Sequence, residues 1–365
     1  MPLYVDAVIK EWEAVRESHS ESPSGLHNTL YIGGGTPSLL PSSHIEKLVD
    51  AVARVAPLSE VTLEANPSDV DVAVSRQWLS GGINRLSMGV QSFDDTCLKA
   101  LRRRHTAREA VQAYRWAQQA GFTNISLDVI FGFPGNTMPI WEETLRQLVL
   151  LRPQHVSAYQ LSVEEGSAWG RLYEKGKLEL PSQEACAAQY ACLQEVLEKA
   201  GYVQYEISNF CLPGFASRHN SAYWQRVPYV GLGPAAHSFT GTYRYWNVPH
   251  TASYIKRLQQ GNSPKRETDN LSEMDVCNEW IMLGLRTVQG LNLDRFATTC
   301  GQGNHNRLLK QATPFLEAGT LVITIENGNT FLRIPAKHLF IADAITRDCL
   351  LLPEDRCKDP LQNGR

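Results

Sequence analysis

Several residues of this chain that could do chemistry stand at or just after the ends of short apolar runs, where a strand would give way to a loop. The first are in a glycine loop at 33–38, which offers backbone N–H and C=O groups at close range because glycine has no side chain. Glu64, Gln91 and Asp128 end later runs, and such side chains can accept hydrogen bonds from hydroxyl or ammonium groups. Arg103 could hold a carboxylate through two hydrogen bonds. Together these groups would suit a zwitterionic ligand that carries ribose hydroxyls.

Each of these features also has an ordinary structural explanation. The loop at 33–38 lacks the Gly-Lys-Ser/Thr ending of a phosphate loop, so it predicts no nucleoside triphosphate site, and triple glycine alone commonly forms a tight turn. Asp128 alone could equally be a helix cap or one half of a surface ion pair. Arg103 lies in a run of three arginines, which is more often a solvated charged surface. The occurrence of all these residues in strand order nevertheless favours a ligand site.

The elements that must position these residues alternate between strand and helix signals about every thirty residues. Thr106 and Glu109 form a capping box at the start of one predicted helix, and Gly121 closes it. Repeated βα units predict parallel strands, whose carboxyl ends gather functional groups on one rim. We therefore predict an α/β fold, a partial, open TIM-type βα barrel, in preference to a doubly wound sheet. The predicted strands are 29–32, 61–63, 86–90, 125–130 and 156–161, and the predicted helices include 45–55 and 141–151.

The character of the sequence changes after about residue 240. Residues 273–286 predict an amphipathic helix, and 321–334 predict a β-hairpin that turns at Asn327 and Gly328. Helical segments before this hairpin and at 339–351 would complete a small winged-helix-like α+β module. The expected domains are a barrel core at 1–240 and a C-terminal domain at 241–365.

Composition argues against several classes of function. The formal net charge is -3, and the helix near the predicted wing offers chiefly Arg307 and Lys310, so we expect no nucleic-acid binding. A lid or a dimerisation surface, in a homodimer, would suit this module better. No apolar run approaches the roughly 20 residues that span a bilayer, so we expect no membrane span. Charged residues interrupt the first helical stretch at 2–16, which excludes a signal peptide and favours a cytoplasmic protein.

Taken together, the motifs resemble the radical SAM (S-adenosylmethionine) superfamily, in the branch of the oxygen-independent coproporphyrinogen III oxidases and the HemW-type heme chaperones. The motifs include the glycine loop, Glu-Ala-Asn-Pro, Gly-Val-Gln-Ser-Phe and His-Asn-Ser-Ala-Tyr-Trp. The resemblance runs along nearly the whole chain and fades over the last thirty residues. The matching segments are 33–38, 64–67, 84–93, 101–105, 127–135, 205–210, 219–224 and 229–233.

The resemblance implies two binding sites. The His-Asn-x-x-Tyr-Trp motif marks the heme-chaperone branch, in which its histidine, here His219, contacts heme as bound cargo. An imidazole can ligate heme iron, while Tyr223 and Trp224 offer flat apolar surface to the macrocycle. Without the family, the motif would be interpreted as a loop histidine above two core aromatics; His237 is a weaker second candidate. The residues implied to line an S-adenosylmethionine site are Gly34, Gly35, Thr36, Glu64, Gln91, Arg103 and Asp128.

The cysteines depart from the family pattern. Family members place Cys-x-x-x-Cys-x-x-Cys on a loop before a helix that begins much like residues 4–13, and these cysteines hold a 4Fe–4S cluster. Among the eight cysteines of this chain, no two are separated by two or three residues. We expect structural thiols in a reducing compartment. We also expect an N-terminally shortened chain that lacks the first barrel strand and the cluster, and that is inactive in radical chemistry as given.

Three hypotheses follow. The first is a heme chaperone that binds heme and delivers it to recipient heme proteins. The second is a shortened, coproporphyrinogen III oxidase-like enzyme of porphyrin biosynthesis, against which the motif at 219–224 argues. The third is a degenerate, non-catalytic family member that only binds heme, a porphyrin or a partner.

Overall fold

The computed structural model describes residues 2–16, 28–55 and 57–352. The chain forms two compact units, one of Met1–Ser221 with Ile255–Asn262, and one of Ala222–Tyr254 with Ser263–Arg365. The first unit therefore includes a short segment that returns to it late in the sequence, which a single cut near residue 240 does not capture. Helices α9 (Arg218–Trp224) and α10 (Thr251–Gln259) span positions at which the chain passes between the units.

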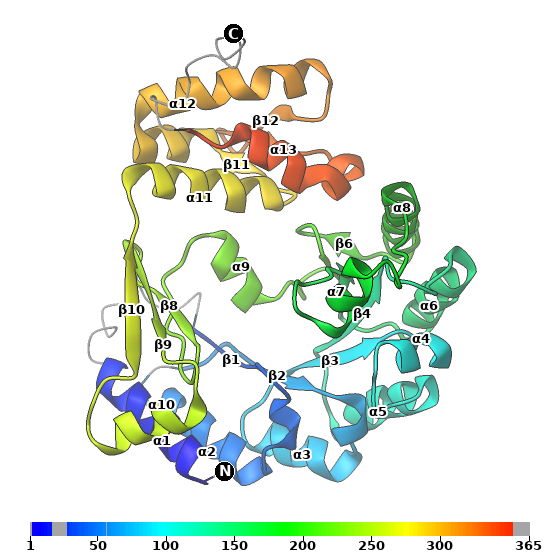
Figure 1. Ribbon diagram of the computed structural model, residues 1–365, viewed down its shortest axis with the longest axis vertical. Helices are drawn as coiled ribbons and strands as arrows, with labels where there is room; N and C mark the ends of the chain where they lie inside the picture. The colour runs from blue at the N-terminus through cyan, green and yellow to red at the C-terminus, as the bar shows by residue number, and fades with distance from the viewer. Residues whose placement is uncertain (1, 17–27, 56, 353–365) are drawn as a thin grey trace. The chain divides into compact units, whose positions relative to one another are not determined.

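A seven-stranded sheet forms the centre of the first unit (Figure 1). Its strand order is β1-β2-β3-β4-β5-β7-β6; the first five strands are parallel, and β7 and β6 are antiparallel additions at one edge. The predicted α/β class is confirmed, and the open strand order is compatible with a partial TIM-type barrel. The bounds are β1 Thr29–Ile32, β2 Glu60–Ala65, β3 Arg85–Gln91, β4 Ile125–Phe131, β5 His155–Gln160, β6 Val203–Gln204 and β7 Asn209–Cys211.

Helices connect the parallel strands and lie along one side of the sheet (Figure 1). Helix α5 begins with the predicted capping box of Thr106 and Glu109, and it ends at Gly121, whose φ of 119° suits glycine. Apolar strand residues such as Leu63, Leu86 and Leu127 are fully buried and form the core beneath the helices. The bounds are α1 Pro2–Val15, α2 Ser42–Ala53, α3 Val72–Ser80, α4 Asp95–Ala100, α5 Ala107–Ala120, α6 Met138–Leu151, α7 Ala168–Glu174 and α8 Gln183–Lys199.

The other face of the parallel sheet is polar. Successive side chains of a strand point to opposite faces, so the register of the parallel strands sets polar residues of neighbouring strands side by side. Thr62 of β2 pairs with Arg85 of β3, and Glu64 pairs with Ser87. Barrel interiors are usually filled by branched apolar side chains. The polar side chains on this face of the sheet indicate that it binds a ligand rather than forming a hydrophobic core.

The second unit contains two antiparallel sheets of three strands, ordered β10-β9-β8 and β11-β13-β12. The predicted hairpin is confirmed, with Asn327 and Gly328 at positive φ in its turn, and so is the helix at 273–286. The segment at 339–351 begins as a 3-10 turn and becomes a helix only at residue 342. The bounds are β8 His237–Phe239, β9 Tyr243–Asn247, β10 Lys265–Asn270, α11 Glu273–Arg286, β11 Leu291–Asn292, α12 Leu293–Glu317, β12 Val322–Glu326, β13 Asn329–Arg333 and α13 Ala342–Cys349.

Helices of the described part of the chain are all too short or too polar to cross a lipid bilayer.

Candidate functional site

Six of the seven residues predicted to contact S-adenosylmethionine line one hollow, which we call the rim hollow, near the carboxyl ends of the parallel strands. The prediction that Asp128 ends its strand is wrong, because Asp128 lies in the middle of β4. The volume of the rim hollow is about 220 Å³. The seventh residue, Gly34, reaches the same place because its backbone N–H donates to Glu64. The lining residues are Gly35, Thr36, Pro37, Glu64, Ala65, Asn66, Gly89, Gln91, Arg103 and Asp128.

Glu64 is held from two sides. Tyr31, on the neighbouring strand β1, donates its hydroxyl to Glu64 Oε1 at 2.9 Å, and the Gly34 N–H donates as well. Burial raises the pKa of Glu64, and these two hydrogen bonds oppose the rise. A Cβ at Gly33 would lie 2.8 Å from Tyr31 Cε1 and 3.0 Å from Glu64 Cδ. The glycine loop therefore packs directly on the Tyr31–Glu64 pair.

Asp128 lies among serine hydroxyls on the polar face of the sheet. Ser87 donates to Asp128 Oδ2 at 3.0 Å, and Ser126 donates to Oδ1 at 3.1 Å. Burial raises the pKa of Asp128, and the hydrogen bonds from serines oppose this. Ser126 Oγ also lies 2.8 Å from Nδ1 of His155, whose Nε2 is 2.8 Å from the Tyr205 hydroxyl. Burial lowers the pKa of His155 well below its usual value, so this imidazole is neutral.

Gln91 and Arg103 complete the rim hollow from the segment that begins at the end of β3. The register of β3 against β4 shifts between Gly89 and Gln91, and Gln91 takes a positive φ of 71°. Such a bulge re-aims a side chain at the end of a strand. The arginine run does not act as one charged surface, because Arg104 pairs with Asp69 at 3.0 Å. Within the described residues, the Arg103 guanidinium has no ion pair.

His219 lies near the start of α9 and contacts strand β1 of the same unit. Its Nδ1 is 2.7 Å from Thr29 Oγ1, and its ring stacks on Tyr31 with centroids 5.1 Å apart. Glu60 of β2 accepts the backbone N–H groups of Arg218 and His219 at 2.9 Å and 3.0 Å, and so caps the helix. Burial lowers the pKa of His219, which favours the neutral imidazole. Thr29, Tyr31 and Glu60 were not among the site residues predicted from the sequence.

Tyr223 and Trp224 continue α9 and belong to the second unit. Within that unit, the Tyr223 ring meets Tyr229 edge-on at 4.8 Å, and Arg286 lies over the Trp224 ring at 4.8 Å. The Trp224 Nε1 is buried without a hydrogen-bond partner in the described part of the chain. A buried, unsatisfied indole N–H is unusual in a folded protein.

His237, the weaker candidate, begins strand β8 and is exposed, with its ring stacked on Trp246 at 5.4 Å. The glycine stretch before it has a structural explanation. A Cβ at Gly231 would lie 2.1 Å from the His237 carbonyl oxygen, so the two backbone segments can approach only if residue 231 is glycine.

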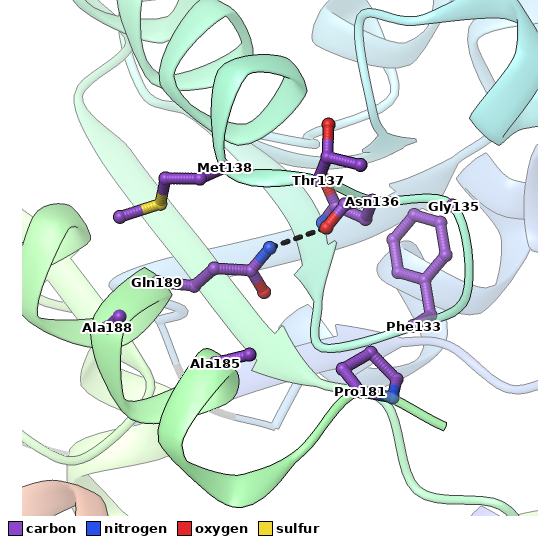
Figure 2. Close-up of a pocket in the computed structure, with 9 residues that line it drawn as sticks. All are labelled: Phe133, Gly135, Asn136, Thr137, Met138, Pro181, Ala185, Ala188 and Gln189. Carbon is purple, nitrogen blue, oxygen red and sulfur yellow. Dashed lines mark hydrogen bonds between the residues drawn. The ribbon is translucent and has the colours of Figure 1, made fainter. Parts of the chain in front are cut away.

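Figure 2 shows a second hollow of about 300 Å³, largely apolar, between the loop after β4 and helix α8. Gln189 holds this loop from both ends, because it accepts the Gly132 N–H at 2.9 Å and donates to the Asn136 carbonyl at 2.6 Å. The backbone carbonyl of Gln189 accepts the Trp141 indole N–H at 2.8 Å. Gln189 thus fixes the loop that follows the strand carrying Asp128.

The chemistry of the rim hollow fits S-adenosylmethionine. Glu64 and Asp128 can accept hydrogen bonds from ribose hydroxyls or an ammonium group, and Arg103 can pair with a carboxylate. An added Cβ at Gly34 or Gly35 would meet nothing within 4 Å, so the backbone there is open to a ligand. His219 likewise fits a heme iron, because burial lowers the pKa of its imidazole and favours the neutral form that ligates metals.

Comparison with known proteins agrees with this geometry. The family model of the radical SAM superfamily matches residues 9–148. The heme chaperone HemW of Bacillus subtilis is 37% identical over 278 residues, which cover 75% of this chain and 73% of that protein. HemW of Synechocystis is 35% identical over 356 residues, covering 96% of this chain and 84% of that protein.

A solved structure shows the same fold. Coproporphyrinogen III oxidase (HemN) from Escherichia coli, a radical SAM enzyme, superposes with a TM-score of 0.75 over 95% of this chain and 82% of that one. The two sequences are 20% identical, so this likeness concerns the fold. On the strength of its sequence relatives, the chain belongs to the radical SAM superfamily and, within it, to the family of HemW-type heme chaperones.

Proposed function

We propose that this protein binds heme through His219 and delivers it to recipient heme proteins. The environment of His219 is the main support for this proposal. Burial favours its neutral imidazole, Thr29 lies within hydrogen-bond distance of Nδ1, and the ring stacks on Tyr31. A neutral imidazole is a common ligand of heme iron, and hydrogen-bond partners orient such a histidine. The relatives named heme chaperones support heme as the cargo.

Tyr223 and Trp224 would add apolar surface for the macrocycle. His237 remains the weaker candidate ligand. His237 is exposed and stacks on Trp246, and within the described residues no hydrogen bond orients its ring as Thr29 orients that of His219. A heme ligand on His219 is therefore the sharper proposal.

The rim hollow would hold S-adenosylmethionine, with Glu64 and Asp128 on the hydroxyl or ammonium groups and Arg103 on the carboxylate. In the family this cofactor, bound to a 4Fe–4S cluster, supplies a deoxyadenosyl radical. None of the eight cysteines here has the Cys-x-x-x-Cys-x-x-Cys spacing, so we propose that the chain as given acts as a binding protein rather than a radical enzyme. The seven described cysteines are free thiols, which supports action in a reducing compartment, the cytoplasm.

Hemin titration followed at the Soret band tests the proposal. We expect saturable binding to the unsubstituted chain and at least about tenfold weaker binding to His219→Ala. His250→Ala removes an exposed histidine and is the matched control, which should bind like the unsubstituted chain. Equal affinity of all three proteins would contradict heme ligation by His219.

A further inference from the structure

We infer that Tyr31 couples the rim hollow to the heme-binding histidine, so that the ionisation state of the Glu64 carboxyl regulates the affinity of His219 for heme. This inference rests on the proposed function, since it concerns the heme that His219 would bind. It adds a positioning residue, Tyr31, that no sequence motif singled out.

The first half of the connection is the contact of Tyr31 with the rim hollow. Its hydroxyl donates to Glu64 Oε1 at 2.9 Å, and Glu64 lines the hollow. Gly33 packs against both side chains so closely that a Cβ would lie within 3.0 Å of each. The Tyr31–Glu64 pair therefore has little room to change its geometry independently of the glycine loop.

The second half is the contact of the same ring with His219. The two rings stack with centroids 5.1 Å apart and planes inclined by 25°. Thr29, two residues before Tyr31 on β1, holds His219 Nδ1 at 2.7 Å. On β2, Glu60 caps the helix that carries His219, four residues before Glu64. Two adjacent parallel strands thus hold both the rim hollow and the histidine.

The direction of the coupling follows from the hydrogen bond. A hydroxyl that donates to an ionised carboxylate makes a stronger bond than one that donates to a neutral group. A cationic ligand in the rim hollow would favour ionised Glu64, strengthen the Tyr31 bond and fix the ring on which His219 stacks. Such a ligand should therefore tighten heme binding, and heme should tighten ligand binding by the same factor.

A double-mutant cycle tests the coupling without requiring any ligand in the rim hollow. Hemin affinity is measured by Soret titration for the unsubstituted chain, Glu64→Gln, Tyr31→Phe and the double variant. Glu64→Gln should weaken hemin binding by about fivefold or more, the lower end of typical coupling between sites. In the Tyr31→Phe background, which keeps the stacked ring and loses the hydroxyl, Glu64→Gln should have no further effect.

Tyr202→Phe is the matched control, because it removes the hydroxyl of another buried tyrosine of this unit, one that donates to Pro153 O. It should leave both the hemin affinity and the effect of Glu64→Gln unchanged. Circular dichroism checks that each variant folds. If Glu64→Gln does not fold, Glu64→Asp replaces it, because the shorter side chain draws the carboxylate back from Tyr31.

The inference is wrong if Glu64→Gln changes hemin affinity equally in both backgrounds or in neither. If hemin binding to the unsubstituted chain does not depend on His219, the proposed function itself fails and the inference falls with it. Comparison of the His219→Ala titration with the cycle distinguishes these two failures.

Discussion

At the scale of single residues, heme ligation depends on how His219 is held. Thr29 Oγ1 lies 2.7 Å from His219 Nδ1. Partners of this kind orient a ligating histidine and raise its basicity. The heme-binding strength of His219 should therefore depend on a residue that contacts no heme.

Thr29→Val keeps the shape of the side chain and removes its hydroxyl. We expect hemin affinity to fall by about 10-fold to 100-fold, the usual effect of losing such a partner, in a Soret titration. Thr62→Val is the matched control, because Thr62 also lies on the polar face but its buried hydroxyl has no partner in the described residues. Unchanged affinity of Thr29→Val would show that the Thr29 hydroxyl does not position the imidazole.

The pH dependence of heme binding follows from the burial of His219. Burial lowers the pKa of this imidazole below its usual 6.5, so it is mostly neutral, and able to ligate, at pH 6.5 and above. Heme binding should persist at pH 6.5 and be lost only on further acidification. Because the unfolded chain binds this proton more readily, stability should also fall as the pH drops below about 6.5. Half-loss of hemin binding above pH 6.5 would contradict the assignment.

At the scale of elements, the glycine loop after β1 determines the shape of the rim hollow. Two of its glycines differ in the space around them. A Cβ at Gly33 would meet Tyr31 at 2.8 Å, whereas a Cβ at Gly35 would meet nothing within 4 Å and would extend into open space at the hollow. Substitution at these two positions should therefore have opposite consequences for stability and for ligand binding.

Gly33→Ala should cost about 1–3 kcal/mol of unfolding free energy, because the added carbon overpacks the Tyr31–Glu64 pair. Gly35→Ala should change stability by less than about 0.5 kcal/mol and instead obstruct the ligand. Denaturant unfolding measures the first effect, and isothermal titration with S-adenosylmethionine measures the second. Equal stabilities of the two variants would refute this explanation of the loop.

The sequence predicted the five parallel strands and several helices of the first unit, because buried parallel strands and amphipathic helices have clear periodicities. Helix α5 shows this best, since its capping box and closing Gly121 are local signals. Strand β10, Lys265–Asn270, could not be predicted: five of its six residues are exposed, it lacks apolar alternation, and it is ordered by pairing with β9. Its structure depends on a partner strand rather than on its own residue pattern.

The candidate site was predictable only in part, namely for the residues of the rim hollow. Glu64 and Gln91 stand at strand ends, and parallel strands bring such ends together whatever their separation in sequence. Asp128 lies in the middle of β4, so its place in the rim hollow depends on the strand register rather than on a strand end. Thr29 and Tyr31 gave no such signal, because their role arises from contact with His219, which is 190 positions from Thr29. The distinction between a stacked, hydrogen-bonded histidine and a loop histidine becomes visible only in three dimensions.

At the scale of the whole molecule, the spacing of the cysteines predicts whether the chain 1–365 can hold a 4Fe–4S cluster. Anaerobic reconstitution with iron and sulfide should leave the chain 1–365 without a 4Fe–4S cluster, because none of its cysteines has the required spacing. Iron and sulfide analysis of the desalted protein, with Mössbauer spectroscopy, provides the measurement. Stoichiometric cluster iron would mean that other side chains ligate it and would restore the hypothesis of a radical enzyme.

Pulsed electron paramagnetic resonance detects directly whether the His219 imidazole ligates heme iron. The ferric heme complex would be prepared with ¹⁵N-histidine-labelled protein, once unsubstituted and once as His219→Ala. We expect hyperfine coupling between the unpaired electrons of the iron and a histidine nitrogen in the unsubstituted complex, and its loss in His219→Ala. Coupling that persists in His219→Ala, or no histidine coupling in either complex, would show that His219 does not ligate heme.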